Sequence, residues 1–356
     1  MGGRRLSTAP EHQALQQCDL GQAPCVHPVF RDAARRQWGA FTAVDVRRAG
    51  LEAVDVQSAF RRGEWARLRR GVYVERAVLA QAEQWRRRHR LDCAAVLLSL
   101  GGTPAISHTS AARLQALVLP PGLSDEVTLT DEGLWRRGRG YSVRCATLPA
   151  HAIRPDGPFR VTTPVRTLVD CAREWDLEDA VIAMDAALQS GAVTAGELRT
   201  AVLEQSHWLG IGQAARAATL ADGRAESPLE TRGRLRIVGS GLPVPELQVE
   251  VRARRGFVAR VDAWYDDAAV AVEFDGRVKY DDPRADRTPA QVLWEEKRRE
   301  DELRALGIRV VRVVQADLGA GWPVVADRLG GLLAVRAVEP RRFTVVRRPQ
   351  RRPAVG

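Results

Sequence analysis

Three acidic residues in the carboxyl-terminal third of the sequence could bind a metal ion together. Asp262 lies in the strand-like segment 259–264, and Glu273 and Asp275 lie in the strand-like segment 269–276. A tight turn midway between the segments would form a β-hairpin and place Asp262 opposite Glu273, with Cβ atoms roughly 4.5–5.5 Å apart. Asp275 is two residues beyond Glu273 and would point to the same face. We therefore predict that the three carboxylates converge.

Converging carboxylates favour a divalent cation. Like charges at this spacing repel, and burying them is unfavourable unless a positive charge compensates. Mg²⁺ or Mn²⁺, which take oxygen ligands at ~2.0–2.1 Å, would supply that charge. Two simpler explanations stay open. Asp262 and Glu273 could form an acidic pair on the surface, and Asp275, followed by Gly276, could mark a turn at the strand end.

Further residues could complete the site. Ser227, Pro228 and Glu230 have the order of a helix start, so a capping role alone explains Glu230, with metal binding as the alternative. Of 54 Lys and Arg residues, only Lys279 and Lys297 are lysines. Lysine is a compact point charge and arginine a planar fork. Either lysine could therefore orient a water molecule or offset developing charge in a reaction.

Segment 226–337 has an element order that could position these residues. The pattern predicts helix, three strands, helix, strand and helix, with the second helix over residues 289–305 and a buried strand over 308–314. Charged pairs four residues apart, such as Lys297 with Asp301, would equally suit a solvent-exposed helix.

This segment resembles a restriction-endonuclease-like family of the PD-(D/E)XK type, whose relatives include the very-short-patch mismatch-repair endonucleases. The motifs that carry the resemblance are Asp262, Glu273-Phe274-Asp275-Gly276, Lys279-Tyr280, residues 296–301 and residues 303–307. The resemblance implies that Asp262 and Glu273 bind metal and that Asp275 is the third acidic position. Glu230 would be the acid of the first helix. The implied activity is that of a magnesium-dependent endodeoxyribonuclease, in which a metal-bound water attacks the phosphodiester bond.

The sequence departs from this family in two places. The PD-(D/E)XK pattern expects lysine two residues after the strand acid, where this chain has Asp275. Lys279 or Lys297 would have to act from a displaced position. Many relatives carry histidine where Lys279 stands, and no histidine follows His207 here. A histidine general base within segment 226–337 is therefore excluded.

A second functional region is predicted at residues 38–76. Thr42 and Asp45 resemble a capping box that opens a helix, a second helix follows over residues 54–62, and a basic hairpin comes next. This is the order of a winged helix-turn-helix, in which a helix enters the major groove and the wing contacts phosphate. The arginines expected to contact DNA are Arg61, Arg62, Arg67, Arg69 and Arg70. The alternative is a small helical subdomain with a basic edge.

The amino-terminal half resembles the AbiEi-type antitoxin family, in which a winged helix precedes an α/β domain. The likeness is carried by residues 41–43, 69–73, 107–112 and 164–170. It implies sequence-directed DNA binding and autoregulation, without catalysis. Residues 77–225 would be an α/β scaffold.

Composition limits these expectations. A chain of 356 residues suits two or three domains, and a net charge of +10 with a pI near 10.2 favours a polyanionic partner such as DNA. Five scattered cysteines without a C-x-x-C pair argue for a reducing cytoplasm. No apolar run reaches the roughly 20 residues of a membrane span, so we expect a cytoplasmic protein without a membrane partner.

The expected fold class is α/β multidomain. It comprises a loose leader (1–37), a winged helix-turn-helix (38–76), an α/β middle domain (77–225), a restriction-endonuclease-like α/β domain (226–337) and a basic tail (338–356). The expected function is a metal-dependent DNA endonuclease directed by the winged helix. The alternatives are an antitoxin-type transcriptional regulator with an inactive nuclease fold, and a nucleoprotein-assembly protein. A monomer would nick one strand, and cutting both would most simply need a homodimer.

Overall fold

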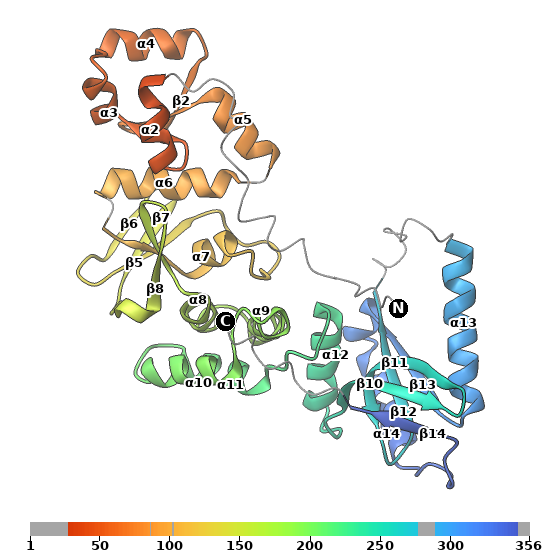
Figure 1. Cartoon of the computed structure of the whole chain (residues 1–356). Helices are drawn as coiled ribbons and strands as arrows, with labels where there is room; N and C mark the ends of the chain where they lie inside the picture. The colour runs from red at the N-terminus through yellow and green to blue at the C-terminus, as the bar shows by residue number, and fades with distance from the viewer. Residues whose placement is uncertain (1–27, 86, 102, 277–288, 348–356) are drawn as a thin grey trace, which may run out of the picture. The chain divides into compact units, whose positions relative to one another are not determined.

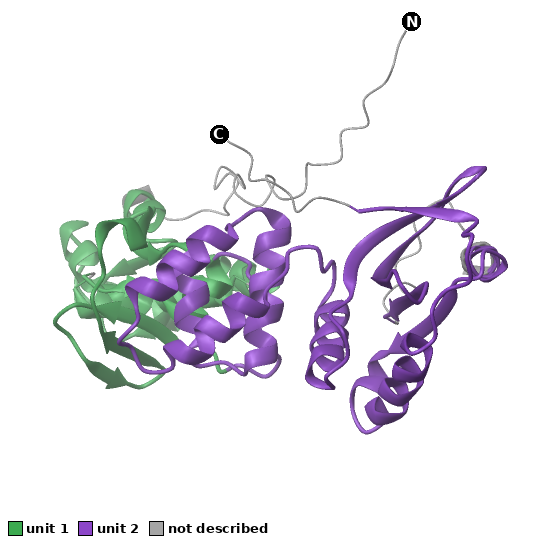
Figure 2. Cartoon of the chain, turned by 90° about the horizontal axis from the view of Figure 1, so that it is seen from below, with its two compact units in different colours: residues 1–114, 124–163 green, residues 115–123, 164–356 purple. Residues whose placement is uncertain are grey.

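The computed structural model describes residues 28–85, 87–101, 103–276 and 289–347. The chain divides into two compact units (Figure 2): unit 1 comprises residues 1–114 and 124–163, and unit 2 comprises residues 115–123 and 164–356. Both units contain sheets and helices, so the mixed α/β, multidomain class is confirmed. The division at Thr163 falls within the segment expected to be the middle domain, and the expected boundary at residue 225 stays a prediction.

The first part of unit 1 is a small antiparallel sheet with helices around it (Figure 1). The strand order is β1-β3-β2. The elements are α2 (Pro28–Arg36), β1 (Ala40–Thr42), α3 (Ala43–Arg48), α4 (Ala53–Arg61), β2 (Trp65–Arg69), β3 (Val72–Glu75) and α5 (Arg76–Gln84). The predicted capping box is confirmed, because Asp45 N donates to Thr42 Oγ1 at 3.2 Å and Thr42 N donates to Asp45 Oδ2 at 2.7 Å.

Helix α2 lies inside the segment that the sequence indicated to be a loose leader, and this part of the expectation is corrected. Phe30, Ala33 and Ala34 are buried at i, i+3 and i+4 spacing, which gives the helix one apolar face. The Phe30 ring stacks on Phe41 at 4.7 Å and meets Trp65 edge-on at 5.2 Å. Contacts with Phe41 and Trp65 stabilise this short, arginine-rich helix, and the sequence of residues 28–36 alone does not indicate them.

The rest of unit 1 is a mixed sheet in the order β6-β7-β5-β4-β9-β8. Its strands are β4 (Ala105–Ile106), β5 (Val127–Asp131), β6 (Arg136–Gly138), β7 (Tyr141–Cys145), β8 (Ile153–Asp156) and β9 (Phe159–Thr162). Helix α6 (Arg88–Leu100) is buried over residues 93–97 and packs with the sheet and with α7 (His108–Leu114).

Unit 2 begins with a group of packed helices. These are α8 (Pro164–Ala172), α9 (Leu177–Ser190), α10 (Ala195–Glu204) and α11 (Ile211–Leu220). A sheet follows in the order β13-β12-β11-β10-β14, in which only β12 and β13 pair in parallel. Its strands are β10 (Glu246–Ala253), β11 (Gly256–Tyr265), β12 (Val270–Asp275), β13 (Arg309–Val314) and β14 (Phe343–Val346).

Helices cover both faces of this sheet. On one face, α12 (Pro228–Gly239) and α14 (Trp322–Leu333) bury Ile237 and Leu329 in a cluster with Val272. On the other, α13 (Pro289–Ala305) buries Leu303 in a cluster with Ala271. The element order predicted for segment 226–337 is therefore present, and it makes an α/β/α arrangement in which β12 lies between β13 and β11.

Strand β14 lies inside the segment expected to be a basic tail, and this expectation is corrected for residues 338–347. The strand pairs with β10, where Val345 lies opposite Val251. Arg341 forms an ion pair with Asp266 at 3.1 Å, and Arg347 forms one with Glu246. These partners lie far away in the sequence. The arginines of this segment therefore predicted a basic tail, because their ion pairs cannot be recognised from the local sequence.

The close approach of α12 to β12 can be tested at Gly233. A Cβ atom at this position would overlap the ring of Phe274, which follows Glu273 in β12. Gly233→Ala should lower the free energy of unfolding by about 1–3 kcal/mol in urea denaturation, since the overlap outweighs the gain in helix propensity. Gly239→Ala, in the same helix with open space around it, is the control and should be neutral or slightly stabilising. Equal stability of both variants would contradict this packing.

Candidate functional site

The three predicted acids line one cavity of about 310 Å³ in unit 2. Strand pairing places Ala263 opposite Val272 and Trp264 opposite Ala271, which confirms the register predicted for the hairpin. Beyond these pairs, Phe274 N donates to Asp262 Oδ2 at 2.8 Å. The Asp262 carboxylate therefore takes a backbone donor of β12 where the β11–β12 ladder ends. The other lining residues are Phe257, Ala259, Arg260, Phe274, Arg299 and Arg312.

Two arginines that the sequence reasoning missed stand at Glu273. Arg299 of α13 lies 3.4 Å from its carboxylate, and Arg312 of β13 lies 3.8 Å from it and 3.7 Å from Asp275. Glu273 is only 8% exposed. Burial raises the pKa of its carboxyl, Arg299 opposes that rise, and the nearby Asp262 adds to it. Arginine therefore compensates part of the negative charge for which the sequence suggested a metal ion.

Glu230 is held at the start of α12. Ser227 caps the helix, as predicted, with Glu230 N donating to Ser227 Oγ at 3.2 Å. The Glu230 carboxylate accepts from Ser227 Oγ at 2.9 Å and from Glu226 N at 2.8 Å. Burial raises the pKa of Glu230, and the charge of Asp262 raises it further. Glu230 therefore has the predicted capping role, and its carboxylate also interacts electrostatically with Asp262 of the cavity.

Gln248 joins Glu230 to Asp262. Its Nε2 donates to Glu230 Oε2 at 2.8 Å and lies 3.3 Å from Asp262 Oδ1. Gln248 is 3% exposed and has φ of +54°, a left-handed conformation rare for a non-glycine residue inside a strand. Its Oε1 is buried without a hydrogen-bond partner among the described residues. The sequence offered one signal for this residue, a lone amide in the strand Leu247–Val251.

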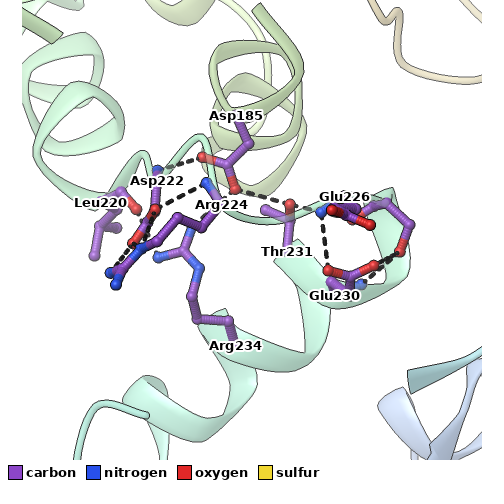
Figure 3. Close-up of polar contacts among 9 residues, drawn as sticks. Asp185, Leu220, Asp222, Arg224, Glu226, Glu230, Thr231 and Arg234 are labelled. Carbon is purple, nitrogen blue, oxygen red and sulfur yellow. Dashed lines mark hydrogen bonds and ion pairs between the residues drawn. The ribbon is translucent and has the colours of Figure 1, made fainter. Parts of the chain in front are cut away.

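A buried polar network anchors the helix that carries Glu230 (Figure 3). Asp185 of α9 accepts from Thr231 Oγ1 at 2.8 Å, from Arg234 at 2.9 Å and from Asp222 N at 2.6 Å. Burial raises the pKa of Asp185 to about 6. Asp222 in turn forms an ion pair with Arg224 at 2.6 Å. Thr231 and Arg234 are three residues apart on one face of α12 and bond the same Asp185 carboxylate oxygen, so the network fixes the start of this helix.

Of the two predicted lysines, the one that the structure describes does not complete the acid cavity. Lys297 is exposed on α13 and does not line the cavity; the cation that α13 places at Glu273 is Arg299. Lys279 lies outside the described residues. Within the described ranges, no three His, Cys, Asp or Glu side chains meet closely enough to hold a metal ion. The structure thus places Asp262, Glu273 and Asp275 in one cavity, but their carboxylates are not close enough together for all three to hold one metal ion.

The five arginines predicted to contact DNA have different surroundings in unit 1. Arg61, Arg67 and Arg70 are exposed. Arg62 forms an ion pair with Glu64 at 2.6 Å. Arg69 donates to the Arg139 carbonyl oxygen at 2.8 Å and lies over the Tyr141 ring, with 4.9 Å from its Cζ to the ring centroid. Three of the arginines are therefore available to a ligand, and two have internal partners.

Helix α4 presents a polar and apolar outer face that the sequence analysis did not single out. Val54, Gln57 and Arg61 are exposed at i, i+3 and i+7, and Val54 is 61% exposed. On the opposite side, Ala59 is buried in a cluster that also contains Phe41 and Trp65. The inner face therefore fixes the helix while the outer face stays open.

Comparison with known proteins gives a family match for the region around α4. Residues 31–76 match the family model described as transcriptional regulator, AbiEi antitoxin. The resemblance to antitoxin-type regulators is thus confirmed for this part of the chain, which includes the expected DNA-binding helices and hairpin.

The matches over longer parts of the chain do not indicate a function. Two uncharacterized proteins of Mycobacterium tuberculosis strains, MT2308 and Rv2248, are each 36% identical to this chain over 157 residues, covering 44% of this chain and 55% of the relative. The chain spans about half the length of these curated relatives. The crystal structure of RV2827C protein from Mycobacterium tuberculosis aligns with 59% of this chain and 82% of its own at a TM-score of 0.34 and 12% identity, too low to support an argument. No described helix is both long and apolar enough to cross a membrane.

The buried position of Glu230 predicts a pH effect on stability. Because its folded pKa lies above the ordinary value of 4.5, the unfolded chain releases this proton first as the pH rises, and ionisation then penalises the folded state. Glu230→Gln removes the penalty. The free energy of unfolding of this variant, relative to wild type, should therefore increase as the pH rises from 4.5 to 7. Urea denaturation at several pH values measures it, with Glu302→Gln on the exposed side of α13 as the control for loss of a charge. A difference that does not vary with pH would refute the coupling.

Proposed function

We propose that this protein is a sequence-directed DNA-binding regulator and that its α3–β3 region acts as a winged helix-turn-helix. The outer face of α4 carries the proposal. Val54, Gln57 and Arg61 form an exposed row on a helix whose other side is fixed in the core. The match of residues 31–76 to a transcriptional-regulator family supports the same function.

The chemistry of this row suits the major groove of DNA. A glutamine amide can bond an adenine edge through two atoms, an arginine can do so with guanine, and an apolar side chain can contact the thymine methyl group. In a winged helix-turn-helix the second helix lies in the major groove. Gln57 and Arg61 would then read bases, and Val54 would pack on a methyl group at the same edge.

The hairpin after α4 would position the helix on the duplex. Arg67 and Arg70 are exposed on β2 and in the turn after it. Arginine contacts with phosphate fix register and orientation without reading sequence. Arg62 and Arg69 would have a different role, because their internal partners hold the ends of β2 in place.

Base reading by α4 can be measured on a duplex selected from a random library by the wild-type protein. Gln57→Ala should weaken binding to the selected duplex roughly tenfold or more, because the substitution removes one bidentate hydrogen-bonded pair with a base. Its affinity for unrelated DNA should not change. Gln81→Ala, the same substitution on the exposed side of α5, is the matched control. Fluorescence anisotropy gives both affinities, and equal binding of the two variants to the selected duplex would exclude base reading by α4.

The acid cavity favours a second candidate function, phosphodiester hydrolysis. The specific observation is Gln248, which has a left-handed backbone and a buried Oε1 without a hydrogen-bond partner among the described residues, and whose Nε2 contacts Glu230 and Asp262. Strained backbone and orphaned buried oxygens concentrate at functional sites. A carboxylate and an amide oxygen are also the donors that Mg²⁺ prefers, so the donor chemistry of Asp262 and Gln248 fits such an ion.

In this second function the chain's own residues would have distinct roles. Asp262 and Gln248 would hold the metal ion, which when bound would activate a water molecule. Arg299 and Arg312 would offset the charge of a phosphate in the cavity, the task for which the PD-(D/E)XK pattern uses lysine. Glu273 and Asp275 would keep these arginines in place through the ion pairs that the structure contains.

Isosteric substitution tests this second function. With Mg²⁺ or Mn²⁺, the wild-type protein should cut supercoiled plasmid, and Asp262→Asn should lower the rate at least a hundredfold, since it removes a charged ligand of the metal. Asp267→Asn, in the exposed turn of the same hairpin, is the control. Mg²⁺ should also raise the Tm of the wild type and of Asp267→Asn but not of Asp262→Asn, which tests metal binding apart from cleavage. A wild-type protein that binds DNA but shows neither cleavage nor a Tm shift would leave the regulator as the function.

A further inference from the structure

A second basic element of unit 1 lies outside the region that matches the regulator family. It is the β6–β7 hairpin, residues 136–145, at one edge of the six-stranded sheet. Arg136, Arg137 and Arg139 are exposed on it, and Trp135 immediately before it is 75% exposed. Three arginines and one large exposed aromatic side chain within five residues make this edge unlike an ordinary solvated strand.

The acidic residues nearest to these arginines are directed at the backbone. Asp131 Oδ1 accepts from Gly133 N and Leu134 N at 3.0 Å each, and Glu132 Oε1 accepts from Leu148 N at 3.0 Å. They shape the turn that presents Trp135. Arg136, Arg137 and Arg139 have no ion-pair partner among the described residues, so their charge remains available to an external anion.

The hairpin adjoins the predicted wing. Arg69 of β2 donates to the carbonyl oxygen of Arg139 at 2.8 Å, and its guanidinium lies over the Tyr141 ring of β7. A hydrogen bond to the tip of the hairpin and a cation–π contact to its second strand hold the two elements side by side. The wing region that carries the exposed Arg67 and Arg70 is thus joined to the β6–β7 hairpin through Arg69.

We propose that the β6–β7 hairpin is a second contact with duplex DNA, in which its arginines neutralise backbone phosphates next to those bound by the wing. Trp135 packs its apolar surface on the sugar edge of the groove. Arg69 acts as a brace that keeps hairpin and wing in register. This inference rests on the proposed DNA-binding function and extends the surface beyond residues 31–76. Duplex DNA is favoured over an acidic protein because the hairpin contacts the wing through Arg69, and the wing is itself proposed to bind phosphate.

Salt dependence distinguishes the arginines of the hairpin from Trp135. For duplex DNA, each arginine that no longer neutralises a phosphate reduces the magnitude of the negative slope of log affinity against log salt by roughly 0.9. Arg136 points to the same face of β6–β7 as Tyr141, and Arg139 lies in the turn between the strands, so Arg136→Gln combined with Arg139→Gln should reduce that magnitude by about two and weaken binding to selected and unrelated duplexes by the same factor. Trp135→Ala should weaken binding with the slope unchanged, because apolar packing releases no counterions. Arg154→Gln, on the opposite edge strand β8 and also exposed, should leave affinity and slope unchanged.

The controls distinguish failure of this inference from failure of the proposed function. The full chain is titrated with both duplexes at several salt concentrations, with Gln57→Ala in parallel. If Gln57→Ala loses selectivity while the double arginine variant binds as wild type, the hairpin inference is overturned and base reading by α4 stands. If the double variant binds DNA normally but loses a polyglutamate peptide that the wild type binds, an acidic protein is the partner instead. Far-ultraviolet circular dichroism and Tm confirm that each variant is folded.

Discussion

The stacking of Phe30 on Phe41 fixes the elements of the proposed DNA-binding surface. The ring centroid of Trp65 in β2 lies 5.2 Å from that of Phe30 and 4.9 Å from that of Phe41. One aromatic cluster therefore joins α2, β1 and the β2–β3 hairpin. Ala59 and Val46 bring α4 and α3 into the same cluster. Because aromatic pairs have preferred geometries and bury large areas, the cluster sets the angle at which the outer face of α4 stands. Base reading needs that angle, since the groove admits a helix only in a narrow range of orientations.

Unit 2 depends on a different constraint, the charge placed around β12. Burial raises the pKa of both Glu230 and Glu273, and the charge of Asp262 raises both further, so three carboxylates interact through one residue. Gln248 bridges two of them, and Arg299 and Arg312 stand at the third. An amide and two guanidinium groups stabilise a fold that would otherwise suffer from buried like charges. The same arrangement leaves a polar cavity with cationic and anionic walls, which suits phosphate chemistry as well as a purely structural role.

The parts predictable from sequence were those set by short-range periodicity. The hairpin register followed from a tight turn midway between the two strands, and the starts of α3 and α12 followed from capping residues. The role of Gln248 could not be foreseen, since its side-chain hydrogen bonds are to Glu230 and Asp262, which come from other elements. The arginines at Glu273 depend on β13 pairing beside β12 and on the packing of α13, and β14 depends on pairing with β10. The two lysines were predicted to act because lysine is rare in this sequence, whereas the cations beside Glu273 in the structure are arginines.

Methylation protection of guanine N7 tests the central claim most directly. The full chain is bound to its selected duplex in the presence of a chelator, so that cleavage plays no part, and dimethyl sulfate then modifies N7 atoms exposed in the major groove. The account predicts that guanines within the site are protected by the wild-type protein and that Arg61→Gln restores their reactivity while the complex still forms at low salt. Unprotected guanines throughout a site that the wild-type protein demonstrably occupies, or protection that Arg61→Gln leaves intact, would contradict the reading of DNA by α4.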